Sequence, residues 1–277
     1  MERYHPIVNF IYFCGVIGCS MFLMHPVCLA FSTIGAFIYV LRLFGWTNAR
    51  KGFDGLFVLM LLTAIMNPAF SHQGITILTY LPTGNVLTLE SIFYGIAAAF
   101  MLASSVMWFR CMSEIITSDK IVYLFGRWFP VLSLVLSMIL GFVPKLHRKL
   151  QEIRRCRGTH VIENLSILIT WALDDVINMT DSMKGRGYGL AGRTSYTIYR
   201  FTKRDGIRLM LFLSALVYII VGCSNDGLVW DYYPKAAGSG FRLYSVSIYL
   251  VYGWLCMFPV IEECWEERRW NKLQSKI

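Results

Sequence analysis

Residues 56–89 read LFVLMLLTAIMNPAFSHQGITILTYLPTGNVLTL, and this stretch contains no Asp, Glu, Lys or Arg. The apolar segment of residues 53–70, which ends at Asn67-Pro68 and the two residues after it, has nearly the length that a bilayer crossing requires, which is about 20 residues. The loop that follows is rich in Thr, Gly and Pro and also lacks Lys and Arg. Basic residues are retained with cytoplasmic segments, so this loop is expected on the outer side. The stretch therefore predicts a membrane span followed by an outer loop.

The composition of the whole chain points the same way. Of 277 residues, 56% are hydrophobic and 16% are charged, whereas soluble domains have about 45–50% and about 25%. These values exclude a disordered or fibrous chain and argue against a single soluble domain. The eight cysteines include no Cys-x-x-Cys pair, so the sequence indicates neither a disulfide framework nor a zinc site. The predicted fold class is an all-α integral membrane protein.

Six apolar segments are expected to cross the bilayer. They are residues 7–24, 27–44, 53–70, 89–112, 206–223 and 243–261. Residues 42–51, where the second segment ends, contain Arg42, Arg50 and Lys51, which places this end of the segment, and with it the N-terminus, on the cytoplasmic side. An even number of crossings then places the C-terminus there as well.

The basic residues are concentrated between the fourth and fifth predicted spans. Residues 145–208 contain 13 Lys and Arg against 6 Asp and Glu. This segregation fits a cytoplasmic module of a membrane protein better than a nucleic-acid-binding surface. The sequence therefore divides into four N-terminal spans (1–112), a cytoplasmic module (113–205), and two C-terminal spans with a tail (206–277).

Two helices are expected in the cytoplasmic module. Residues 131–143 form an apolar run of 13 residues between Pro130 and Pro144, which is short for a span and indicates an interfacial or buried helix. Residues 161–184 predict an amphipathic helix, with apolar residues at 161, 165, 168, 172, 176, 179 and 183. Its Glu163, Asp174 and Asp181 argue against a bilayer crossing.

Two short motifs stand out in the cytoplasmic module, one at the end of the basic segment 145–158 and one directly after the amphipathic helix. They are Cys156-Arg157-Gly158 and Gly185-Arg186-Gly187. One interpretation is helix capping, in which Gly adopts a left-handed conformation and Arg meets the last carbonyls and the helix dipole. The alternative is a matched pair of anchors that enter pockets on a partner.

Other chemistry has little support in the sequence. Residues 185–189 do not follow a strand or open a helix and lack the Lys-Ser/Thr of a phosphate-binding loop. Asp174 and Asp181 are two helical turns apart, about 10 Å, which is too far for shared metal ligation. The histidines, at 5, 25, 72, 147 and 160, show no ligand spacing. No cofactor and no metal site are expected.

The combination resembles the transmembrane T component of energy-coupling factor (ECF) transporters, the family that includes the cobalt transport protein CbiQ. The most specific part of the likeness is residues 181–189, DSMKGRGYG, followed by Gly192-Arg193-Thr194. Asn67-Pro68, Thr88-Leu89-Glu90 and Phe142-Val143-Pro144 also look like landmarks of that family.

The resemblance implies a fold, a function and partners. It implies about six transmembrane helices plus amphipathic coupling helices, in a multi-pass plasma-membrane protein with both termini cytoplasmic. The two triplets would be coupling sites, at which Arg157 and Arg186 each dock into one of two ABC-type ATPases. Their movements would reach a separate substrate-binding membrane subunit that takes up a vitamin or a transition metal such as cobalt or nickel. The chain itself would be non-catalytic.

Two other functions remain open from the residues. A self-contained secondary transporter usually shows charges or broken helices at mid-depth in paired halves. An integral-membrane enzyme needs polar clusters within its spans, and the sequence offers few candidates, since Asn67 and Glu90 lie at span ends.

Overall fold

The computed structural model of the chain describes residues 4–71, 74–80, 86–126, 129–158, 161–188, 199–225, 227–234, 237–238 and 242–274. The helices within these ranges are α1 (Pro6–Phe22), α2 (Pro26–Phe70), α3 (Leu89–Ile115), α4 (Ser118–Gly126), α5 (Pro130–Arg157), α6 (Val161–Gly185), α7 (Lys203–Ser224) and α8 (Leu243–Gln274). Two short antiparallel pairs accompany them: β1 (Ile77–Tyr80) with β2 (Val86–Thr88), and β3 (Trp230–Asp231) with β4 (Ala237–Gly238). The predicted all-α membrane fold is confirmed.

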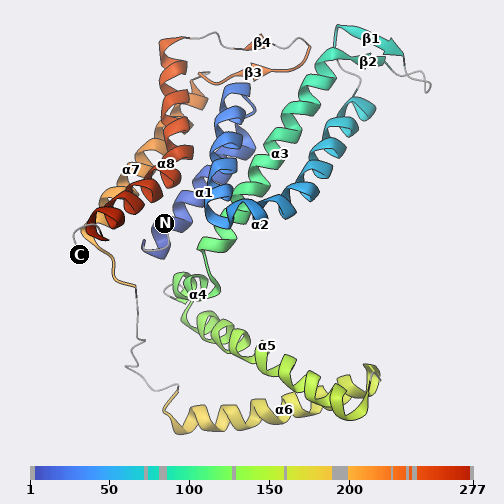
Figure 1. The fold of residues 1–277 in the computed structure, drawn as a ribbon, viewed down its shortest axis with the longest axis vertical. Helices are drawn as coiled ribbons and strands as arrows, with labels where there is room; N and C mark the ends of the chain where they lie inside the picture. Colours follow the sequence, from blue (N-terminus) through green and yellow to red (C-terminus); the bar gives the residue numbers. More distant parts are fainter. Residues whose placement is uncertain are drawn as a thin grey trace. The chain divides into compact units, whose positions relative to one another are not determined.

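The chain divides into two compact units. Unit 1 comprises Met1–Ile116 and Phe201–Ile277, and unit 2 comprises Thr117–Arg200. In unit 1, α1, α2, α3, α7 and α8 pack side by side (Figure 1), and both strand pairs lie at one end of this bundle. The described chain begins and ends at the opposite end of the same bundle.

Six helical segments of the described residues are long and apolar enough to cross a membrane: Pro26–Arg50, Gly52–Phe70, Leu89–Ile115, Val131–Cys156, Lys203–Ser224 and Leu243–Gln274. The number agrees with the expectation, but the membership differs in two places. The first predicted span forms α1, which at 17 residues is shorter than these six. The candidate that takes its place lies in α5, which the sequence assigned to the cytoplasmic module.

The second and third predicted spans lie within α2. Gly45 breaks this helix with φ 69° and ψ 164°, a conformation that glycine adopts without a Cβ clash. Arg110 from α3 stabilises the chain around this break in α2. Its guanidinium lies 4.5 Å from the centre of the Phe44 ring and donates to the carbonyl of Asn48 at 3.1 Å. It also occupies the space beside Gly52 where a side chain would stand.

Close contact holds the helices of unit 1 together. Gly95 on α3 lies so near the second half of α2 that an added Cβ would meet the carbonyl oxygen of Ala64 at 2.8 Å. The buried Trp108 indole on α3 donates to Ser32 of the first half of α2 at 3.1 Å. Small residues and interhelical hydrogen bonds are the usual means by which membrane helices associate.

A His-Pro pair begins each of the first two helices. His5 precedes Pro6 at the start of α1, and His25 precedes Pro26 at the start of α2. The His25 ring nitrogen Nδ1 accepts the backbone N–H of Val27 at 3.3 Å, and Nε2 lies 2.9 Å from the Tyr249 hydroxyl. Burial lowers the pKa of His25, since desolvation disfavours the charged ring. The neutral ring is also the form in which Nδ1 can accept a hydrogen bond.

In unit 2, α5 and α6 pack against each other, and α4 packs on α5. The apolar run 131–143 and the basic segment after it were expected as separate elements, and Pro144 was expected to bound the run. That expectation is wrong, because α5 is one helix of 28 residues that continues through Pro144. The amphipathic helix expected at 161–184 is confirmed as α6.

Gly95→Ala is expected to lower thermal stability in detergent. The added methyl group collides with backbone of α2, and overpacking of this kind costs about 1–3 kcal/mol. The matched control is Gly18→Ala on α1, where nothing lies within 4 Å of the added carbon. Equal melting temperatures for the two variants would contradict the close α2–α3 contact.

Lowering the pH from 7.5 to 5.0 is expected to destabilise the folded protein, in part through His25. The folded state disfavours the protonated ring, because burial lowers the pKa of His25, whereas the unfolded chain takes up a proton as the pH falls below about 6.5. His25→Asn keeps a capping acceptor without the titration, so its melting temperature should depend less steeply on pH. An unchanged slope for His25→Asn would exclude this role.

Candidate functional site

Helices α5 and α6 form an antiparallel hairpin, and contacts between them lie on both sides of Pro144. Phe142 stacks on Trp171 with ring centres 6.3 Å apart. Lys145 pairs with Asp175 at 3.8 Å. The Lys149 ammonium also lies 5.7 Å from the centre of the Trp171 ring. These contacts support α5 on both sides of the proline, which explains why the helix continues through it.

The first triplet ends α5 at the turn of this hairpin. Arg157 is the last helical residue, and Gly158 follows with φ 77° and ψ −154°. The Gly158 N–H donates to Arg154 O at 2.9 Å. The Gly158 carbonyl accepts from the side chain of Asn164 at 2.9 Å, and Asn164 is buried on α6. The position of Gly158 requires glycine, and Asn164 fixes the turn.

The second triplet ends α6 in a Schellman motif. The Tyr188 N–H donates to Met183 O at 3.1 Å, and the Gly187 N–H donates to Lys184 O at 3.0 Å. Gly187 has φ 77°, the left-handed conformation that this cap requires. Gly185, by contrast, is still helical. The capping function that the sequence suggested is therefore present, and Gly187 provides it.

The side chain of Arg186 is not needed for this cap. The backbone N–H groups of residues 186–188 already satisfy the carbonyls of Ser182, Met183 and Lys184. The Arg186 side chain is exposed, and no hydrogen bond or ion pair joins it to any residue that the structure describes. The hydrogen bonds of the helix end are therefore complete without the side chain of Arg186.

The two triplets lie at opposite ends of α6. Arg157 stands at the hairpin turn, just before α6 begins, and Arg186 stands just after it ends. A helix of 25 residues is about 38 Å long at 1.5 Å per residue. The structure therefore does not bring the two arginines together, and each would meet a separate surface. Gly189 and Gly192-Arg193-Thr194, which also carried the family resemblance, lie outside the described residues.

A second apolar stripe of α6 is exposed, and the sequence analysis missed it. The residues of α6 that are least exposed, including Asn164, Leu168, Ala172 and Met183, are spaced at intervals that place them on one side of the helix. The exposed apolar residues form another stripe and keep 47–85% of their surface accessible: Ile162, Leu165, Ile169, Leu173, Val176 and Ile177. Because apolar residues occupy more than one side of this helix, periodicity alone could not show which side packs on α5.

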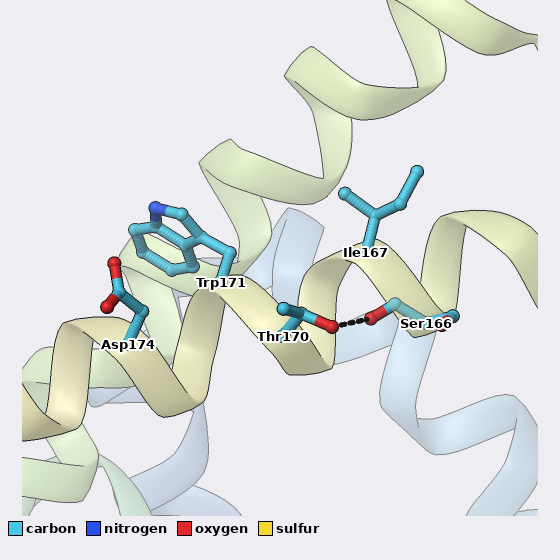
Figure 2. Close-up of a pocket in the computed structure, with 5 residues that line it drawn as sticks. All are labelled: Ser166, Ile167, Thr170, Trp171 and Asp174. Atoms are coloured by element: carbon cyan, nitrogen blue, oxygen red, sulfur yellow. Dashed lines mark hydrogen bonds between the residues drawn. The ribbon is translucent and has the colours of Figure 1, made fainter.

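An open pocket of about 480 Å³ lies on α6, lined by Ser166, Ile167, Thr170, Trp171 and Asp174. Figure 2 shows these side chains on a single helix, with the Thr170 hydroxyl donating to the Ser166 carbonyl at 3.0 Å. Asp174 is the one charged residue of the five. Such a surface suits a partner protein better than a small molecule, which is normally enclosed.

The acidic residues of α6 form no metal site in the part of the chain that the structure describes. Within those residues, no group of three or more His, Cys, Asp or Glu side chains could hold a metal ion. Asp175 pairs with Lys145, and Asp181 lies 3.9 Å from Lys184. The Asp175 pair lies at the contact between α5 and α6, where Asp175 is partly buried, and the Asp181 pair lies on an exposed face of α6.

The sequence analysis also missed an ionic cluster in unit 1. Arg208 on α7 pairs with Glu262 on α8 at 2.5 Å, and its guanidinium lies 4.0 Å from the centre of the Tyr4 ring. The Tyr4 hydroxyl also donates to Glu262. Burial, together with that carboxylate, raises the pKa of Tyr4 well above its ordinary value. The three residues tie the start of the chain to α7 and α8.

The comparisons with known proteins add no assignment: the chain matches no protein-family model and no curated protein.

Arg208→Met is expected to lower the free energy of unfolding by about 3–5 kcal/mol, because it leaves the buried Glu262 carboxylate without its cation. The double variant Arg208→Met/Glu262→Met should recover most of the loss, since no uncompensated charge remains. Thermal unfolding of the detergent-solubilised chain measures both. If the double variant is less stable than Arg208→Met alone, the ion pair is not the source of the effect.

Proposed function

We propose that the chain is the transmembrane coupling component of an ECF-type importer. It transmits movements of two ABC-type ATPases to a separate membrane subunit that binds a vitamin or a transition metal such as cobalt or nickel. The observation that carries this proposal is the exposed Arg186 beside a helix cap that is complete without its side chain. The chain is non-catalytic in this role, and ATP hydrolysis takes place on the partner chains.

The separation of the triplets supports two docking points. Cys156-Arg157-Gly158 and Gly185-Arg186-Gly187 lie at the two ends of α6, about 38 Å apart along its axis, a spacing that suits two partner chains better than one pocket. Each arginine is followed directly by a glycine with positive φ, so the helix ends beside each of them. An arginine at such an end can form bidentate bonds with a partner carboxylate.

The exposed apolar stripe of α6 supports a second kind of contact. Its members, from Ile162 to Ile177, present aliphatic side chains that the chain itself leaves uncovered. A substrate-binding subunit with an apolar surface would cover them, so that movement of the hairpin displaces that subunit. The proposed location is the plasma membrane, with both termini and unit 2 on the cytoplasmic side, and the basic residues of segment 145–208 support this orientation.

Arg186→Ala is expected to abolish ATP-driven uptake by the assembled importer. Truncating an arginine that is buried against a partner acid costs about 2–5 kcal/mol, enough to release the ATPase. Uptake of labelled cobalt, nickel and vitamins by cells measures the effect once one substrate is found for the unaltered chain.

Lys184→Ala is the matched control, because Lys184 is an exposed cation two positions away on the same helix. It should transport normally. Normal uptake by Arg186→Ala, at an unchanged level of inserted protein, would contradict the proposed coupling role.

A further inference from the structure

Helix α5 consists of two halves of different chemistry. From residue 131 to 143 every residue is uncharged, and six large apolar side chains keep 39–76% of their surface accessible: Val131, Leu132, Val135, Ile139, Leu140 and Val143. From residue 145 to 157 the helix carries six Lys and Arg and a single acid, Glu152. The change occurs at Pro144, within one continuous helix.

Three arginines of the basic half have no partner among the described residues. Lys145 pairs with Asp175 at 3.8 Å and Lys149 pairs with Glu152 at 3.0 Å. Arg148, Arg154 and Arg155 are exposed, and no ion pair or hydrogen bond joins their side chains to the described chain. Arg148 and Arg155 are seven residues apart and so share a face, which differs from that of the buried Ile153.

We propose that this half of α5 binds anionic phospholipid headgroups through Arg148, Arg154 and Arg155, while the apolar half enters the adjoining leaflet. Guanidinium groups bind phosphate oxygens in bidentate fashion. An apolar helix of 13 residues is about 20 Å long, which is less than the hydrocarbon thickness of about 30 Å. A segment of this length, followed at once by cations, fits one leaflet and its headgroups.

Lipid fits the apolar half better than a protein groove does. Val131 and Leu140 lie on opposite sides of the helix, nine residues or about 180° apart, and both are exposed. A groove covers one side of a helix, whereas acyl chains can reach every side of α5 that α4 and α6 leave open. This inference does not rest on the proposed coupling role, since it concerns residues other than Arg186 and a different partner.

The test is native mass spectrometry of the full-length chain in detergent, titrated with phosphatidylglycerol or phosphatidylcholine. The triple variant Arg148→Gln/Arg154→Gln/Arg155→Gln should bind phosphatidylglycerol about 100-fold more weakly, at about fivefold for each arginine near a charged surface. Its weak binding of phosphatidylcholine should not change. The triple Arg→Lys variant keeps the charge and should lose much less affinity.

A second triple variant controls for net charge. Arg200→Gln/Lys203→Gln/Arg204→Gln removes three exposed cations outside α5 and should weaken phosphatidylglycerol binding by less than about threefold, because these cations lie outside the proposed headgroup site. Equal effects of the two triple variants, or no effect of the first, would overturn the proposal. A photo-crosslinking residue at Val135 in native membranes should form phospholipid adducts, and an adduct with a protein would overturn it as well.

Discussion

Direct contact between α3 and its neighbours is the constraint on which unit 1 depends. Apolar helices within a bilayer gain little hydrophobic free energy from one another, so close backbone approach and interhelical hydrogen bonds must hold them together. Helix α3 supplies both, because Gly95 meets the second half of α2, Trp108 binds Ser32 of the first half, and Ser105 lies 3.3 Å from Ser20 of α1. Loosening this helix would weaken its contacts with α1 and with both halves of α2 at once.

Unit 2, unlike unit 1, has few buried residues among those that the structure describes. Its two long helices touch along one stripe each and leave most of their apolar and basic side chains exposed. A hairpin with so little internal burial leaves apolar and basic surfaces open to other molecules. Three different surfaces of the hairpin are available: the exposed Arg186 at the end of α6, the apolar stripe of α6, and the two halves of α5.

The sequence predicted the helices well and their contacts poorly. Run length identified α1, both halves of α2, α3, α7 and α8, because a bilayer crossing demands a long uncharged segment. Pro144 was misjudged as a helix boundary because the support from Trp171 and Asp175 comes from another helix. The Tyr4–Arg208–Glu262 cluster joins residues that are far apart in the chain and leaves no local pattern. The two triplets correctly marked the ends of α5 and α6. Only the backbone hydrogen bonds of residues 186–188 show that Gly187 caps α6 and that the side chain of Arg186 takes no part in the cap.

The identity of the proteins that bind the chain is the most direct test of the proposed coupling role. The tagged chain would be extracted from its native membrane in mild detergent and its co-purifying proteins identified by mass spectrometry. Two ABC-type ATPases and a small hydrophobic subunit are the expected result, and that subunit would give the substrate class. Recovery of the intact chain alone, without an ATPase in several detergents, would contradict the coupling role.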